Sequence, residues 1–128
     1  MPLSRIGNKV GLSAPAVAER IRKLEETGVI KGYHARIAPE AVGRSVSAFI
    51  NLTTDPRNYK SVKTLAADMN QITWCHHISG DASFIIQVQV EDLPVLESVV
   101  ECLSSFGQTQ TAIVLSTAVD KVSMVPLP

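Results

Sequence analysis

Four charged side chains stand close together at residues 19 to 23, within a stretch of sequence that has the pattern of a short helix. Ser13 is a suitable N-cap, because its hydroxyl can accept a hydrogen bond from a free amide of the first turn. Pro15 falls in that first turn, where a missing N–H costs little, and Gly28 is suited to end the helix. The sequence therefore predicts a helix over residues 14–27 that carries cations along one side.

The apolar residues of this helix, Val17, Ile21 and Leu24, follow the i, i+4, i+7 spacing of one buried stripe. At about 100° per residue, the other side of the helix holds small residues near its start and charged residues further along. A helix of this kind can enter the major groove of double-stranded DNA. The candidate DNA-contacting residues are Ser13, Pro15, Ala16, Glu19, Arg20, Arg22 and Lys23.

A shorter helical stripe precedes this helix at Leu3, Ile6 and Val10, and Gly11 supplies a turn between the two. Two helices joined by a Gly-containing turn make a helix-turn-helix. An ordinary helical hairpin with a solvated charged face has the same pattern, so a second observation is needed to separate the two.

The distribution of charge supplies that observation. Residues 1–44 hold eight Lys or Arg and four Asp or Glu, whereas residues 45–128 hold four and eight. This asymmetry favours a basic nucleic-acid-binding part followed by an acidic part with another role. Any phosphate contacts must come from the basic part.

The composition is that of a protein with a packed core. The chain has 128 residues, of which 45% are hydrophobic, enough for one domain or for one domain with a small appendage. No apolar run approaches the roughly 20 residues that span a bilayer, and the first residues lack the zones of a signal peptide. The sequence thus predicts a cytoplasmic protein with no membrane partner.

Residues 75–77, Cys-His-His, are of the types that bind metals. On a strand, however, Cys75 and His77 point to one side and His76 to the other, and a closed zinc site needs about four ligands. No second ligand pair is visible, so structural Cys and His are favoured over a metal site. The sequence also contains no nucleophile elbow or phosphate loop. We therefore expect no metal, no cofactor, no catalytic residue and no enzymatic activity.

The elements that position these residues follow from the hydrophobic pattern. The pattern predicts a strand at residues 29–37 and a short helical turn at residues 39–42. The charge and the hydrophobic pattern both change at Gly43, so we expect the domain boundary between residues 43 and 44. The second domain, 44–128, is expected to hold strands at 46–53, 72–78, 84–90 and 110–116, helices near 62–69 and 93–103, and an extra strand at 119–125. This order is that of a ferredoxin-like βαββαβ domain with an antiparallel sheet. The predicted fold class is α+β, a partial helix-turn-helix followed by the ferredoxin-like domain.

One face of this sheet is expected to meet the two helices, and the other to be open. Phe49 and Ile85 point toward the open face, because they stand between the inward-facing apolar residues of their strands. An open face with large apolar residues favours contact with another protein over a merely decorated surface. We therefore expect at least a homodimer.

The connection between the second and third strands contains Gly80 and Asp81, which predict a tight hairpin. Asp81 and Ser83 could present polar atoms to a small ligand, and so could Thr109 and Thr111, which share one face of the last strand. Ordinary turn and strand chemistry would explain the same residues.

Three blocks of the sequence together resemble the Lrp/AsnC family of bacterial and archaeal feast/famine transcription regulators: residues 11–33, 78–88 and 109–115. The resemblance implies a regulator that binds double-stranded DNA and forms a homodimer, often assembled into an octamer. It also implies a small effector, commonly an amino acid, bound near the hairpin and the last strand. The implied effector-binding residues are Gly80, Asp81, Ala82, Ser83, Thr109 and Thr111.

The chain departs from the family pattern at the hairpin. The family usually places an aromatic residue and then an Asp where this chain has Ala82 and Ser83. A carboxylate that could pair with an effector ammonium is then missing at position 83, and charge-assisted hydrogen bonds are the stronger ones. We therefore expect weak or altered amino-acid binding, with Asp81 as the only nearby acid.

The family also has a further helix before the segment at residues 3–10. Two short helices bury little on their own, so three alternatives stand: cover from another subunit, a true start upstream of Met1, or weakened DNA binding. The main alternative function is accordingly a family member without DNA binding, acting as a ligand-sensing or hetero-oligomerising module. A small ferredoxin-like enzyme is a weaker alternative, because no residues for its chemistry are visible.

Overall fold

The computed structural model describes residues 11–121, and these divide into two compact units, one reaching to Arg36 and the other beginning at Ile37. The division falls before the boundary expected after Gly43, so the short helical turn that ends there goes with the second unit. The helix expected at residues 3–10 lies outside the described residues. Among the residues that are described, no helix has the length and apolar character needed to cross a membrane.

The first unit contains helix α2, at Ala14–Glu26. The helix begins as predicted: the Ser13 hydroxyl accepts a hydrogen bond from the Ala16 amide at 3.3 Å, and Pro15 stands in the first turn. It also ends as predicted, since Gly28 has a φ of 79° and donates its N–H to the Glu25 carbonyl at 3.1 Å. A positive φ suits glycine because it has no Cβ to meet the backbone.

The segment that follows α2 does not form the strand predicted at residues 29–37. Val29, Tyr33 and Ile37 are 67%, 70% and 66% exposed. An alternating pattern makes a strand only where a neighbouring chain segment takes up the backbone hydrogen bonds, and no part of residues 11–121 pairs with this one. The helical turn after it is confirmed as the 3-10 helix Pro39–Val42, which ends at Gly43.

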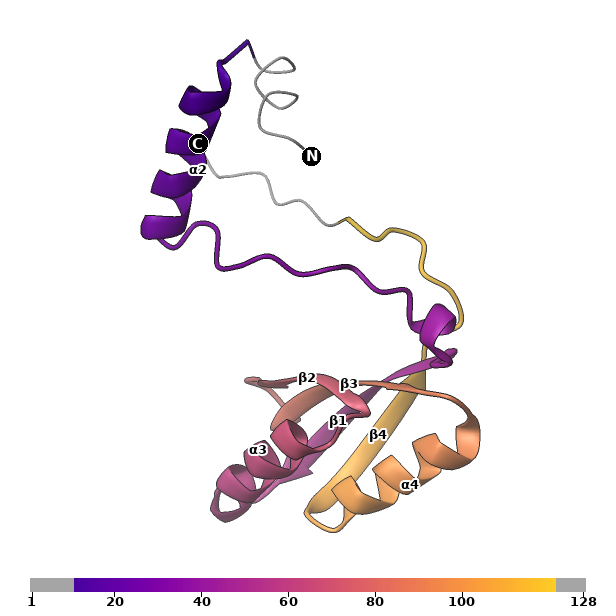
Figure 1. The fold of residues 1–128 in the computed structure, drawn as a ribbon. Helices are drawn as coiled ribbons and strands as arrows, with labels where there is room; N and C mark the ends of the chain where they lie inside the picture. The colour runs from indigo at the N-terminus through magenta and orange to yellow at the C-terminus, as the bar shows by residue number, and fades with distance from the viewer. Residues whose placement is uncertain (1–10, 122–128) are drawn as a thin grey trace. The chain divides into compact units, whose positions relative to one another are not determined.

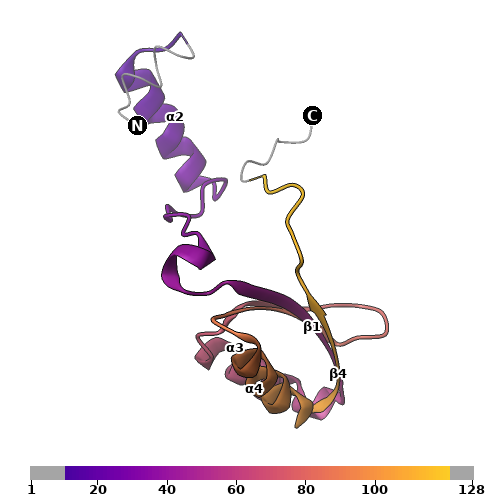
Figure 2. The same ribbon diagram turned by 90° about the vertical axis from the view of Figure 1, so that its right-hand side faces the viewer.

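The second unit is built on a four-stranded antiparallel sheet with the strand order β2-β3-β1-β4. The strands are β1 at Val46–Thr54, β2 at Ile72–His77, β3 at Phe84–Val90 and β4 at Gly107–Ile113. Helix α3 at Tyr59–Asp68 joins β1 to β2 after the short 3-10 helix Pro56–Asn58, and α4 at Leu93–Ser104 joins β3 to β4. Both helices cover the same face of the sheet (Figures 1 and 2). The predicted βαββαβ order and the α+β class are therefore confirmed.

The core lies between this face of the sheet and the two helices. Alternate residues of β1 and β3 point into it, as the two-residue period of a strand requires. The buried core residues are Ala48, Ile50, Leu52, Val62, Phe84, Ile86, Val88, Val90, Leu96, Val99 and Leu103. Full burial of each large member stabilises the fold by about 1.5–3 kcal/mol, so the second unit has a hydrophobic core of its own.

Strand β4 is shifted from its prediction: it runs over residues 107–113 rather than 110–116. A Cβ added at Gly107 would lie 2.0 Å from the Thr53 carbonyl oxygen. Glycine allows this close approach of two backbones, so pairing with β1 begins at the glycine itself. Residues 119–121 form no strand, and the rest of the strand predicted at 119–125 lies outside the described residues.

Candidate functional site

At about 100° per residue, Glu19, Arg22, Lys23 and Glu26 lie on the side of α2 away from Val17, which is 4% exposed, and Arg20 flanks that side. The rest of the predicted apolar stripe is less covered within the described residues, since Ile21 is half-buried and Leu24 is 39% exposed. All seven candidate DNA-contacting residues lie on this helix or at its N-cap: Ser13, Pro15, Glu19, Arg20, Arg22 and Lys23 are exposed, and Ala16 is half-buried.

The Arg22 guanidinium has acceptors on two sides. Its Nη2 and Nε donate to the two carboxylate oxygens of Glu19 at 2.6 and 3.1 Å, and its Nη1 donates to Glu26. The hydrogen bond from Arg22 holds the pKa of the Glu19 carboxyl below its usual value. Sequence reasoning did not single out Glu26, although its i, i+4 spacing from Arg22 is the signal for such a pair.

A groove of about 570 Å³ lies on the sheet beside the hairpin between β2 and β3. Its lining comes from β1, the hairpin and β4: Asn51, Thr53, Ile78, Ser79, Asp81, Ala82, Gln108, Thr109 and Gln110. Asp81 is the one charged residue in this lining, and the remaining polar groups are amides and hydroxyls, which both donate and accept hydrogen bonds. The groove can therefore hold a small polar ligand that carries an amine.

The structure brings some of the predicted effector residues to this groove and leaves others out. Asp81, Ala82 and Thr109 line it, and Gly80 lies next to Asp81 with a φ of 107°. Thr111 does not line the groove: it pairs with Ile50, whose side chain lies in the core, so Thr111 is on the helix face of the sheet. Thr109 is on that face too, since it pairs with the core residue Leu52 and its hydroxyl lies 3.2 Å from that of Ser104 on α4, so Thr109 borders the groove while its hydroxyl is turned toward α4. The predicted effector residues did not include four polar residues of the lining: Asn51, Thr53, Gln108 and Gln110. Of these, only Gln108 lies before residue 110, where β4 was predicted to begin.

Ser83 is oriented differently from the expectation. It is 9% exposed, and its N–H donates to the Leu52 carbonyl at 2.8 Å. Its hydroxyl accepts from the Thr54 N–H at 3.1 Å and donates to the Thr54 carbonyl at 3.2 Å. The side chain thus binds β1 and does not line the groove. The Ser83 hydroxyl is therefore engaged with Thr54, and the weak or altered amino-acid binding expected from the missing acid stays a prediction.

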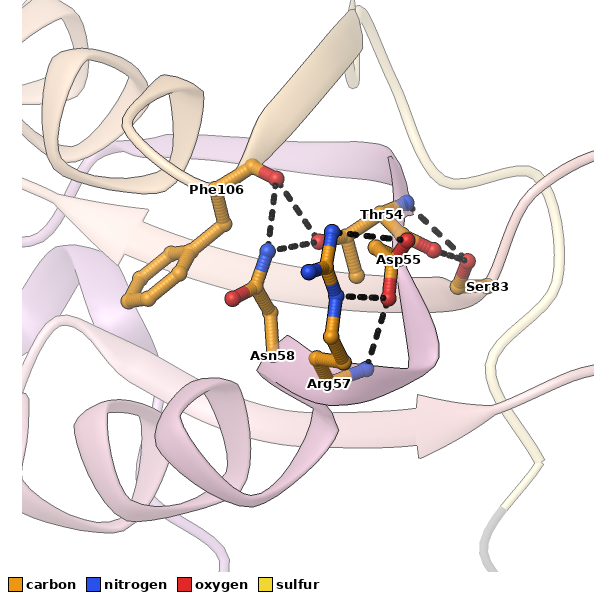
Figure 3. A network of polar contacts seen from close by, with 6 residues as sticks. All are labelled: Thr54, Asp55, Arg57, Asn58, Ser83 and Phe106. Carbon is orange, nitrogen blue, oxygen red and sulfur yellow. Dashed lines mark hydrogen bonds and ion pairs between the residues drawn. The ribbon is translucent and has the colours of Figure 1, made fainter.

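The end of β1 also holds the start of β4 (Figure 3). The Thr54 hydroxyl donates to the Phe106 carbonyl at 2.7 Å, and the Asn58 amide donates to the Thr54 hydroxyl at 3.1 Å. Next to them, Asp55 accepts hydrogen bonds from the backbone and side chain of Arg57, which lower the pKa of the Asp55 carboxyl. Thr54 therefore links two walls of the groove, the hairpin through Ser83 and β4 through Phe106.

The hairpin itself is longer than the predicted tight turn. Strand β2 ends at His77 and β3 starts at Phe84, and the Ile78 N–H closes the loop by donating to the Ser83 carbonyl at 3.0 Å. The Thr53 hydroxyl donates to the Asp81 carbonyl at 3.3 Å. Contacts with β1 thus hold the loop at two points and present Asp81 to the groove.

The face of the sheet opposite the helices carries an aromatic cluster. The rings of Phe49 and Trp74 are 5.7 Å apart between centroids, and those of Trp74 and His76 are 4.5 Å apart. Ile85 stands opposite His76 in the β2–β3 ladder and so shares this face. The mixed, partly apolar surface expected from the alternation is therefore present.

A second depression, of about 470 Å³, lies between α3 and the edge strand β2. Cys75 and His77 line it, with His77 stacked on Phe84 at 5.0 Å between centroids, while His76 points to the other face of the sheet. Burial raises the pKa of the Cys75 thiol. The described part of the chain contains no group of three side chains that could hold a metal ion. Cys75 packs against the hydrophobic core, and His77 packs on Phe84.

Two protein-family models match this chain. One, described as the Lrp/AsnC ligand binding domain, matches residues 47–124, and the other, described as a winged helix-turn-helix DNA-binding segment, matches residues 1–31. The first match covers the second structural unit's sheet and both its helices, and the second includes α2.

Individual relatives agree with these matches. The HTH-type transcriptional regulator LrpA of Mycobacterium tuberculosis is 34% identical over 118 residues, which cover 90% of this chain and 79% of the relative. The structure of LrpC from Bacillus subtilis matches with a TM-score of 0.88 at 29% identity, covering 94% of this chain and 86% of LrpC. A feast or famine regulatory protein of M. tuberculosis complexed with L-methionine matches with a TM-score of 0.85 at 32% identity, covering 97% and 86%. Transcription regulators, the class to which these relatives are assigned by name, are not enzymes. The chain belongs to the Lrp/AsnC family of DNA-binding transcription regulators that respond to effectors.

Proposed function

We propose that this chain binds double-stranded DNA through the outward face of α2, and that an amino acid or related metabolite in the groove beside the hairpin controls that binding. The observation that carries the proposal is the arrangement of α2, in which exposed cations stand on the side away from buried Val17. Lys23 and Arg20 are suited to phosphate oxygens, and small Pro15 and Ala16 let the start of the helix approach the bases.

The chemistry of the groove supports an amino acid as the effector. Asp81 is a counter-charge for an ammonium group. The side-chain amides of Gln108 and Gln110, and the Gly80 N–H beside Asp81, can donate to a carboxylate. The L-methionine complex of the M. tuberculosis relative, at 32% identity, supports the same class of ligand.

The open face of the sheet supports assembly. Phe49, Trp74 and Ile85 form a partly apolar surface that a second copy of the chain can cover. We infer a homodimer through this face, assembled further into an octamer, as the family resemblance implies. We also propose a cytoplasmic location, which the regulators among its relatives support.

The test is an electrophoretic mobility shift of the full chain on a mixture of random duplexes, repeated in the presence of each of the twenty amino acids. We expect retarded DNA that at least one amino acid changes. A chain that retards no DNA, yet binds an amino acid in calorimetry, would instead be the ligand-sensing module without DNA binding. A chain that does neither would contradict the proposal altogether.

A further inference from the structure

Arg22 stands at the centre of the outward face of α2, and acids hold it from two sides. Glu19 accepts from Nε and Nη2, the two N–H groups on one edge of the guanidinium, at 3.1 and 2.6 Å, while Glu26 accepts from Nη1. The side chains of Glu19, Arg22 and Glu26 are 51%, 53% and 59% exposed. A flexible cation is thereby fixed in a plane while it stays open to solvent.

Not all N–H groups of the Arg22 guanidinium are used by the two glutamates. An arginine has about five N–H donors in a rigid fork, and the two glutamates take three of them. One N–H of Nη1 and one N–H of Nη2 then remain, and these two nitrogens together can reach two neighbouring acceptors. Guanine presents such a pair, O6 and N7, in the major groove.

The presence of the acids themselves needs a reason. At about 100° per residue, Glu19 and Glu26 fall on the same side of α2 as Arg22, opposite Val17. An unpaired acid on a surface that meets phosphates repels them. Both acids are paired with Arg22, and the hydrogen bond from Arg22 holds the pKa of the Glu19 carboxyl below its usual value.

We propose that Glu19 and Glu26 are positioning residues that fix the Arg22 guanidinium for a two-point contact with one guanine of the operator. The proposal rests on DNA binding through α2. It separates two roles on the same helix: Arg22 reads a base, while Lys23 and Arg20 add attraction that is independent of sequence.

The test is selection of binding sites from a random duplex library by the full chain and its variants, with helix content checked by circular dichroism. The parent chain should enrich guanine at one position of each half-site. Arg22→Ala should lower that preference by about fivefold to a hundredfold. Glu19→Gln should also lower it, by about threefold or more, even though removal of a negative charge strengthens attraction to DNA in general.

Two comparisons decide whether Glu19 acts through Arg22. Glu40→Gln removes the same charge from an exposed site in the second unit and should leave the base preference unchanged. In the Arg22→Ala background, Glu19→Gln should have no further effect on the preference, because coupled residues are not additive.

Three results would overturn the inference. In the first, the Glu19→Gln variant keeps the guanine preference and binds all duplexes more tightly. The Glu19 carboxylate of the parent would then be only a solvated partner of Arg22. In the second, the parent binds DNA without any guanine preference. In the third, the parent binds no DNA at all, and the proposed function then fails together with the inference.

Discussion

The Ser83 hydroxyl binds both backbone polar atoms of Thr54, accepting from its N–H at 3.1 Å and donating to its carbonyl at 3.2 Å. Ser83, which the sequence suggested as a ligand-binding residue, thus holds the end of β1 to the hairpin. Because the Thr54 side chain in turn binds the Phe106 carbonyl, one residue connects both walls of the groove. The walls of the groove are therefore held by groups that do not line it.

We expect Ser83→Ala to destabilise the chain by about 1–2 kcal/mol, because two part-buried backbone groups of Thr54 lose their partner. Urea denaturation followed by circular dichroism measures the change. Ser98→Ala is the matched control: its exposed hydroxyl donates to the Pro94 carbonyl within α4, and such a change should stay within about 0.5 kcal/mol. Equal losses for the two variants would show that the Ser83–Thr54 contact adds nothing.

Gly107→Ala tests the close approach of β4 to β1. The new Cβ would lie 2.0 Å from the Thr53 carbonyl oxygen and 3.1 Å from its carbon, both of them backbone atoms. Since the backbone must move, we expect a loss of about 1–3 kcal/mol in the free energy of unfolding. Gly32→Ala meets only the His34 side chain at 3.4 Å and should change stability little. A Gly107→Ala chain as stable as the parent would contradict the register of this strand pair.

The element order and the ends of α2 could be predicted from sequence because they depend on local signals. Ser13, Pro15 and Gly28 act within one turn of the helix, and the stripes of α3 and α4 follow a local period. The strand expected at 29–37 was wrong because a strand also needs a partner, which no local pattern reports. The register of β4 depends on the contact of Gly107 with Thr53, and no spacing rule joins residues so far apart in the chain.

In the candidate sites, too, features that depend on local sequence could be predicted, and features that depend on contacts between distant segments could not. The face of α2 was predictable from helix geometry, and Asp81 from its place in a hairpin. The orientation of Ser83 was not, because its partner Thr54 comes from another strand. Asn51 and Gln110 stand opposite each other across β1 and β4, and their shared position is visible only once the register is known.

Asp81→Asn tests the charge in the groove. The carboxylate is the one charge in the groove's lining, and a hydrogen bond to a charged group contributes about 1.5–3 kcal/mol. We therefore expect amino-acid affinity in isothermal calorimetry to fall by about tenfold or more, with stability unchanged. Asp68→Asn, at the exposed end of α3, should bind like the parent. An affinity that survives Asp81→Asn would place the ligand elsewhere.

Assembly is tested on the open face of the sheet. Light scattering at micromolar concentration should give at least twice the 13.8 kDa chain mass. Phe49→Glu should shift the distribution toward the monomer, because it sets a charge beside Trp74 in a surface that another copy must cover. The emission of Trp74, the only tryptophan of the chain, should move to the red on dissociation. A parent chain that is monomeric would contradict the dimer.

The central claim is that α2 carries the DNA-binding surface, and the most direct measurement is fluorescence anisotropy of a labelled duplex titrated with the full chain at several salt concentrations. We expect the logarithm of the binding constant to fall linearly with the logarithm of salt concentration, because binding releases counterions from the DNA. Lys23→Ala should weaken it for all sequences and reduce the slope by about one, while Lys60→Ala on α3 should leave it unchanged. No binding at any salt concentration, or the same slope for Lys23→Ala as for the parent, would contradict the account.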